Sequence, residues 1–152
     1  MPDSCADPAK PALSIWSNAT CIGCRGGQTG VDAMPKSMFE RYGGFANVSK
    51  IVMAFYDKAL DSDIIGHHFE NVEMSRQIDH QTKFIASVMG GPASYTDDAL
   101  HRVHAHLGID KEQFDEMTAL LEETLEDFDF DKSDIDEVMG HIRARARHII
   151  TA

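Results

Sequence analysis

Histidine is the residue type that offers this chain most of its potential for chemistry. The 152 residues include eight histidines: His67, His68, His80, His101, His104, His106, His141 and His148. An imidazole has a pKa near neutrality and a ring nitrogen that binds iron, copper or zinc. Because most histidines in proteins are surface residues or hydrogen-bonded core residues, each one is judged by the positions around it.

His104 lies on an apolar face. A short helix predicted over residues 98–107 places Leu100, Val103, His104 and Leu107 on one stripe. A neutral imidazole that faces an apolar cavity suits an axial metal ligand, but a buried histidine bonded to the protein itself would show the same spacing. His101, one turn away, is the alternative ligand.

A second helix, predicted over residues 75–88, carries polar and apolar groups on one face: Gln77, His80, Gln81, Phe84 and Val88. Polar groups on an inward face must find partners or line a site. The alternative is that this face is solvated while Ile78 and Ile85 face the core.

Tyr56 lies on the apolar face of a third predicted helix, among residues at helical spacing: Val48, Ile51, Val52, Phe55, Tyr56 and Ala59. A buried tyrosine hydroxyl needs a partner, which Gln77 or Gln81 could supply where the helices cross. Three such groups around one small cavity would suit a diatomic ligand that carries partial negative charge.

The pattern of the chain after residue 36 predicts an all-α fold, because no stretch alternates with period two for long enough to form a strand. Two helix starts are predicted from capping boxes, Asp110 with Gln113 and Ser133 with Asp136, the second ahead of apolar residues at helical spacing from Ile135 to Ile149. Gly90, Gly91 and Pro92 end the helix over residues 75–88. Residues 37–152 are expected to form one domain.

Residues 1–36 differ in composition from the rest. Prolines and a glycine pair interrupt every candidate helix, so we expect an irregular or partly disordered N-terminal extension. Its Cys21 and Cys24 form a C-x-x-C pair that is followed by Arg25, not by the histidine of a covalent haem attachment motif. Cys5 adds a third thiol, but no fourth metal ligand lies nearby at the spacing of a zinc-finger site.

The charge and hydropathy of the chain exclude several classes. A net charge of −11 argues against nucleic-acid binding, which needs a basic face. No apolar run approaches a membrane span, and no secretory signal is visible. We therefore expect a globular protein of the cytoplasm, with reduced thiols.

Several segments resemble the group I truncated haemoglobins, particularly the cyanobacterial members, in the order and near the spacing of that family. Together they cover roughly residues 37–150. They are the runs FERYGG at 39–44, FYDKAL at 55–60, VEMSRQIDHQTKF at 72–84, GGP at 90–92 and VHAHLGI at 103–109, with Tyr95 between the last two. The resemblance implies a two-over-two helical sandwich around one haem b.

The resemblance also implies residue roles. His104 matches the proximal iron ligand, and Tyr56 matches the distal tyrosine that donates to a bound ligand. Gln77 and Gln81 match distal polar positions, and His80 matches a residue that binds iron from the distal side in some cyanobacterial members. The contacts expected to complete the pocket are apolar: Phe69, Phe84, Val88 and Leu100.

The function implied is reversible binding of O₂, NO or CO, with nitric oxide dioxygenation or reduction of nitrogen oxides as candidate chemistry and a reductase as a candidate partner. A haem-based gas or redox sensor that signals through residues 1–36 is the alternative. Ligand-free haem is expected to be six-coordinate, with His80 opposite His104. The chain departs from the family at two positions. His68 replaces the first of two phenylalanines that the family often has at the corner before the distal helix, and Asp97 replaces the usual glycine after Thr96.

Overall fold

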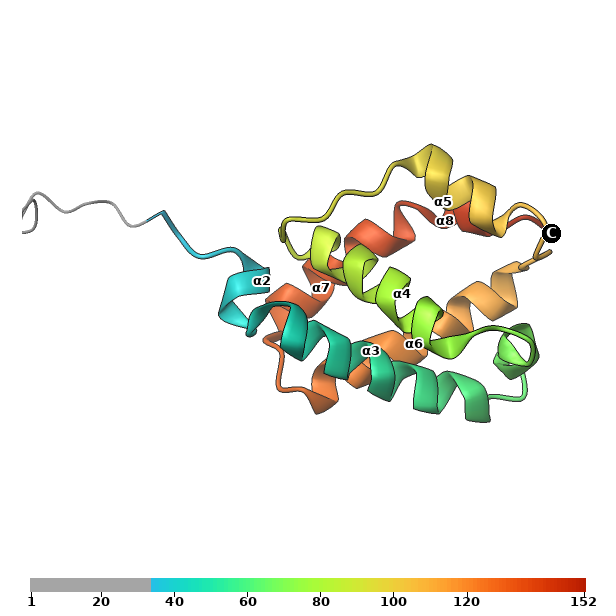
Figure 1. Ribbon diagram of the computed structural model, residues 1–152, viewed down its shortest axis with the longest axis horizontal. Coiled ribbons are helices and arrows are strands. Elements are labelled where there is room, and N and C mark those ends of the chain that lie inside the picture. The colour runs from blue at the N-terminus through green and yellow to red at the C-terminus, as the bar shows by residue number, and fades with distance from the viewer. Residues whose placement is uncertain (1–33) are drawn as a thin grey trace, which may run out of the picture. The chain divides into compact units, whose positions relative to one another are not determined.

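The structure is a computed structural model that describes residues 34–152. Within this range every element is helical, which confirms the all-α prediction. The elements are α2 (Met38–Arg41), α3 (Gly44–Asp61), the 3₁₀ helix η2 (Gly66–Phe69), α4 (Met74–Val88), α5 (Asp97–His104), α6 (Lys111–Asp127), α7 (Lys132–Arg143) and α8 (Ala146–Ile149) (Figure 1).

The helices form two layers and a smaller pair. Helices α3 and α4 lie side by side and form the most extensive helix–helix contact of the described residues. Helices α6 and α7 form the second pair. Helix α3 also packs on α6, so that the pairs face one another in the two-over-two arrangement (Figure 1). The short α5 lies along α8 at one end of the sandwich, where a helix of eight residues is stabilised mainly by packing.

The apolar face predicted for α3 is its buried face. Val48, Ile51, Val52, Phe55, Tyr56 and Ala59 are all buried there. Gly43, just before the helix, has a φ of +91°, a left-handed conformation that a residue with a Cβ adopts only at a cost. The turn from α2 into α3 therefore depends on this glycine.

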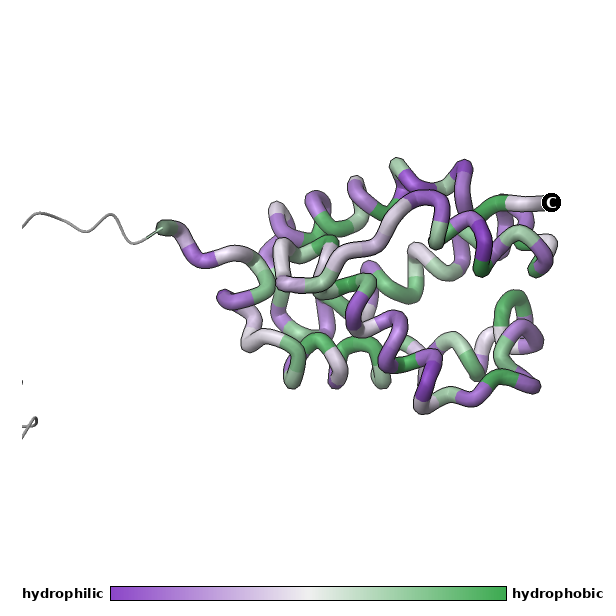
Figure 2. The backbone as a smooth tube through the Cα atoms, turned by 45° about the horizontal axis from the view of Figure 1, so that its top comes forward, coloured by the Kyte–Doolittle hydropathy of each residue, from purple (hydrophilic) through white to green (hydrophobic). Residues whose placement is uncertain are grey.

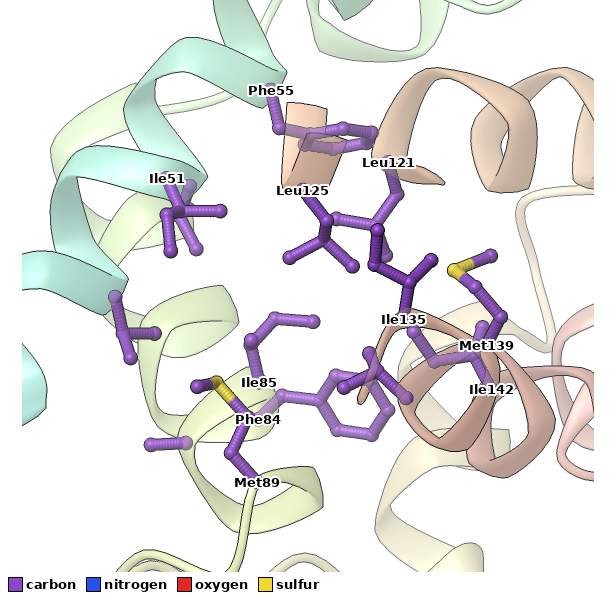
Figure 3. Packing of buried hydrophobic residues seen from close by; sticks show 14 of the residues in the cluster. Ile51, Phe55, Phe84, Ile85, Met89, Leu121, Leu125, Ile135, Met139 and Ile142 are labelled. Atoms are coloured by element: carbon purple, nitrogen blue, oxygen red, sulfur yellow. The ribbon is translucent and has the colours of Figure 1, made fainter. Parts of the chain in front are cut away.

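The core lies between the two layers. Hydrophobic and hydrophilic residues alternate along the helices, as expected when each helix buries one face (Figure 2). Ile85 of α4, Leu125 of α6 and Ile142 of α7 belong to one cluster of buried side chains (Figure 3). These three are almost fully buried, with exposed fractions of 0%, 0% and 1%.

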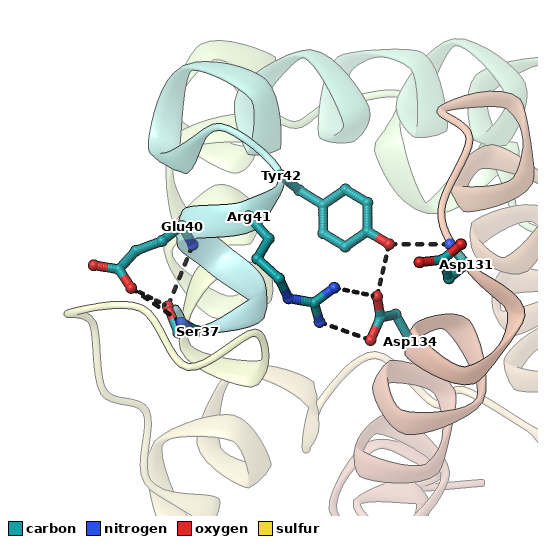
Figure 4. A network of polar contacts seen from close by, with 6 residues as sticks. All are labelled: Ser37, Glu40, Arg41, Tyr42, Asp131 and Asp134. Carbon is teal, nitrogen blue, oxygen red and sulfur yellow. Dashed lines mark hydrogen bonds and ion pairs between the residues drawn. The ribbon is translucent and has the colours of Figure 1, made fainter. Parts of the chain in front are cut away.

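A polar network joins the start of the domain to α7. Ser37 and Glu40 form a capping box at the first turn of α2. Arg41 donates two hydrogen bonds to the Asp134 carboxylate, of 2.9 and 2.8 Å, and the Tyr42 hydroxyl donates a third, of 2.6 Å (Figure 4). Three donors on one carboxylate tie residues that are more than 90 positions apart.

Helix boundaries differ from the predictions in three places. The capping box of Asp110 and Gln113 is present, but the one predicted for Ser133 and Asp136 is wrong, because Asp131 is the N-cap of α7 and the helix has already begun at Lys132. Helix α5 ends at His104, not at 107, since the chain turns there. A further turn after Arg143 places Ile149 in the separate helix α8.

The predicted extension lies almost entirely outside the described residues, and so do Cys5, Cys21 and Cys24. Of its residues, the structure describes Met34, Pro35 and Lys36, which are exposed and not helical. Residues Lys36–Ala152 form one compact unit. Among the described helices, none is both long and apolar enough to cross a membrane.

Candidate functional site

A cavity of about 270 Å³ opens between the helix layers, and most of the surface that lines it is apolar. It is bounded by α3, η2, α4, α5 and α6, together with residues of α7 and α8. Seven of the residues singled out in the sequence line it: Tyr56, Phe69, Gln77, Gln81, Phe84, Leu100 and His104. Segments up to 48 positions apart thus bring one imidazole, one phenol and two amides into one apolar space.

Two residues of the predicted set do not line this cavity. His80 is exposed on the outer side of α4. Val88 lines a different hollow, beside Ser37 and His141. Both follow from the geometry of α4. The side chains of Gln77, Gln81 and Phe84 define the strip that faces the cavity, and His80 lies at the margin of this strip. Val88 continues the strip but lies one turn beyond Phe84, at the end of α4.

His104 is held in one tautomer by the backbone of its own helix. Its Nδ1 lies 2.7 Å from the carbonyl oxygen of Leu100. Because a carbonyl can only accept, Nδ1 carries the hydrogen and Nε2 keeps its lone pair in the neutral ring. Burial lowers the pKa of His104, and the bond to Leu100 offsets this in part. The ring is therefore neutral at pH 7, which is the state that binds a metal.

Tyr56 and Gln77 form the polar centre on the opposite side. The side-chain amide of Gln77 donates a hydrogen bond of 2.9 Å to the Tyr56 hydroxyl oxygen. Since that oxygen accepts, the hydroxyl hydrogen of Tyr56 is available to another acceptor. Burial raises the pKa of Tyr56 to about 12, so the phenol keeps its hydrogen at neutral pH. The sequence predicted this partner for Tyr56.

The rest of the lining carries no sequence pattern that distinguishes it from an ordinary core. Phe114, Leu121, Ile142 and others were recognised only as apolar residues at helical spacing, which is equally the mark of a core. His68 and Gln113 also line the cavity, and their side chains lie 3.2 Å apart. His68 was visible as a departure from the family pattern and Gln113 as a capping residue, but nothing in their spacing placed them together.

The walls fit a flat, largely apolar prosthetic group. Val103 and Leu107 line the cavity from the α5 side yet remain 56% and 38% exposed. Leaving such side chains in water is unfavourable, and a bound apolar group would cover them. The donor set fits as well, because one neutral imidazole is the single axial ligand that haem iron needs. His101 on the same helix and His106 in the turn that follows it are exposed.

Comparison with known proteins identifies the class. The bacterial-like globin family matches residues 37–151, which is most of the chain and all of the region around the cavity, and the chain belongs to that family. Within the family its relatives are group 1 truncated haemoglobins. The one from Synechocystis is 31% identical over 106 residues, which are 67% of this chain and 86% of the relative. The one from Tetrahymena pyriformis is 29% identical over 112 residues, covering 72% and 93%.

Solved structures agree on the fold. The 2/2 haemoglobin of Synechococcus, with covalently attached haem, superposes with a TM-score of 0.70 at 25% identity, covering 77% of this chain and all of the other. The Fe(III) truncated haemoglobin of Tetrahymena pyriformis gives a TM-score of 0.69 at 25% identity, covering 76% and 98%. The predicted fold is therefore confirmed as the two-over-two globin sandwich. Membership of a globin family implies a haem cofactor and binding of diatomic gases.

Proposed function

We propose that the cavity holds one haem b, that His104 Nε2 is the iron ligand, and that the protein binds O₂, NO or CO reversibly. The observation that carries the proposal is the geometry of His104. Its Nδ1–H is committed to the Leu100 carbonyl at 2.7 Å, and the ring lines an apolar cavity. Nε2 is then the ring nitrogen whose lone pair can bind a metal, and burial keeps this nitrogen unprotonated.

When bound, the haem supplies an iron centre that takes up a diatomic ligand. The chain's own residues decide how firmly that ligand is held. The Tyr56 hydroxyl keeps its hydrogen and can donate it, because Gln77 already occupies its oxygen. Gln81 lines the same cavity and offers a second amide. A donor that is held in place before the ligand arrives costs little further ordering.

This polarity favours ligands that gain negative charge on binding. O₂ is such a ligand, whereas CO remains nearly neutral and gains less from a donor. We therefore propose O₂ as the ligand that the cavity retains best. Nitric oxide dioxygenation is the chemistry that we propose to follow from it. That reaction would convert NO and O₂ to nitrate and would draw one electron from the bound haem, so a reductase would be needed to restore the reduced protein.

Haem titration of the purified protein tests the proposal. We expect saturation at one haem per chain, a visible spectrum that changes on reduction, and further distinct changes when CO or O₂ is added to the reduced protein. Saturation far from one haem per chain, or a reduced spectrum insensitive to both gases, would contradict the proposal. Steady consumption of NO by the oxygenated protein with an added reductant then tests the dioxygenation.

We also propose that residues 37–152 suffice for haem binding. The lining of the cavity comes entirely from residues 55–149. A chain that starts at Lys36 should take up haem and bind O₂ as the full chain does. A changed O₂ affinity in the shorter chain would instead favour the sensor function, in which residues 1–36 respond to the ligand.

A further inference from the structure

His68 and Gln113 meet at the border between the cavity and solvent. Both side chains line the cavity and both residues are half-buried. His68 belongs to η2 and Gln113 to the first turn of α6, and they are 45 positions apart. The contact between them, His68 Nε2 to Gln113 Oε1 at 3.2 Å, therefore spans the rim from one wall to the other.

The capping box of α6 determines which way the Gln113 amide is turned. The backbone N–H of Asp110 donates to Gln113 Oε1 at 3.2 Å, and the N–H of Gln113 donates to the Asp110 carboxylate at 2.9 Å. A backbone N–H can only donate, so the atom facing it is the amide oxygen. His68 meets that same oxygen, and its Nε2 must then carry a hydrogen and donate.

Helix η2 also contributes to the wall of the cavity on the side of Tyr56. Phe69, the residue after His68, lines the cavity and packs edge-on against the Tyr56 ring, with ring centroids 5.3 Å apart. Holding His68 to α6 thus holds Phe69 over the cavity. A second side-chain bond, from Ser62 Oγ to Glu116 Oε1 at 2.8 Å, also joins this region to α6, but neither of its residues lines the cavity.

We propose that the hydrogen bond from His68 to Gln113 is a latch on the cavity rim that slows the loss of haem. This inference rests on the proposed function. A rigid planar cofactor is far wider than a diatomic gas, so it leaves only when η2 and α6 separate and their bond breaks. O₂ and CO pass without that separation. The latch therefore acts on retention of the cofactor.

The test measures the rate at which haem passes from each variant to an excess of a haem-free acceptor globin. His68→Phe keeps a ring of similar size and leaves the capping box intact. We expect it to lose haem about fivefold faster than wild type, the factor that corresponds to one neutral hydrogen bond. Ser62→Ala is the matched control, and its haem loss should stay within twofold of wild type.

A second pair of variants separates the bond from changes in packing. Gln113→Glu keeps an acceptor for both Asp110 N–H and His68 and makes that acceptor charged, so we expect haem loss slower than in wild type. In the His68→Phe background the same substitution should no longer slow haem loss relative to that background. Nitrogen-15 spectra of the haem-free protein should show His68 protonated at Nε2, which checks the contact without any cofactor.

Three results would overturn the latch: unchanged or slower haem loss in His68→Phe, equally fast loss in Ser62→Ala, or an effect of Gln113→Glu that is the same in both backgrounds. Each of these leaves the proposed function standing, because the variants still bind haem. A wild-type protein that binds no haem would overturn the proposed function, and the latch with it.

Discussion

The Tyr56 hydroxyl oxygen lies 2.9 Å from the side-chain nitrogen of Gln77, and this bond joins α3 to α4 inside the cavity. It orients the phenol as a donor, because its oxygen is already occupied. The bond crosses the interface of the two helices that pack most extensively, so the donor belongs to a firmly packed part of the fold.

Tyr56→Phe should raise the O₂ dissociation rate constant about tenfold or more. A hydrogen bond to a partly charged acceptor is worth about 1.5–3 kcal/mol, and each 1.4 kcal/mol is roughly a factor of ten. Stopped-flow displacement of O₂ by CO measures the rate. The CO dissociation rate should change far less, which serves as the control. Equal effects on both gases, or none, would show that Tyr56 does not donate to the ligand.

The same donor should persist at alkaline pH. Burial raises the pKa of Tyr56 to about 12, and a raised pKa in an acid means that the protonated form persists to higher pH. The O₂ dissociation rate should therefore stay flat from about pH 7 to about pH 10, where an ordinary tyrosine is already half ionised. A rise in the rate centred near pH 10 would contradict the burial of this hydroxyl.

His80→Ala tests the predicted sixth ligand. The described arrangement is the open one, with His80 exposed, so ligation by His80 requires α4 to turn it into the cavity and to disturb the Gln77–Tyr56 bond. A balance of a few kcal/mol between the two arrangements is enough for such a change. We expect sharp low-spin bands in the reduced, gas-free wild type and a high-spin spectrum in the variant. A high-spin wild type would show that the open arrangement dominates.

Asp134→Asn tests the network at the start of the domain. Hydrogen bonds from Arg41 and then Tyr42 lower the pKa of Asp134. Its stabilisation is thus present above the unfolded pKa of about 3.9 and is lost as the pH falls through the lower folded pKa. Urea unfolding at pH 7 should show a loss of about 1–2 kcal/mol, limited because the Arg41 side chain is 42% exposed to water.

The difference between Asp134→Asn and wild type should shrink as the pH falls below about 4, because the unfolded state takes up a proton there and the folded carboxylate follows at its lower pKa. Haem binding should be retained, because neither Asp134 nor Arg41 lines the cavity. A difference in stability that is the same at all pH values would show that the ion pair contributes nothing.

The sequence predicted the helical class and much of the site because helical spacing records which residues share a face. Tyr56, Gln77 and His104 were each placed on a face that the structure turns toward the cavity. The Leu100 carbonyl that fixes the His104 tautomer was not predicted, since a bond from a side chain to its own helix depends on the rotamer. His80 was placed on the site face although its side chain is exposed, because a helical face is broad and its margins reach solvent.

Contacts between distant segments were beyond prediction from one sequence. The approach of His68 to Gln113 depends on how η2 packs against α6, and no periodicity encodes that distance. Likewise, Asp134 was passed over, although it collects three hydrogen bonds from α2 and the residue that follows it. Local caps were predicted with mixed success, because Asp131 and Ser133 are both good N-caps and packing decides between them.

The central claim, that His104 binds the iron, is tested most directly by His104→Gly with and without added imidazole. Removing the ring should abolish the wild-type haem spectrum or reduce haem occupancy sharply, and free imidazole should restore the spectrum by entering the space left beside Leu100. His101→Ala, which alters the exposed histidine one turn away, should keep the wild-type spectrum throughout. A wild-type spectrum in His104→Gly without imidazole, or its loss in His101→Ala, would contradict the claim.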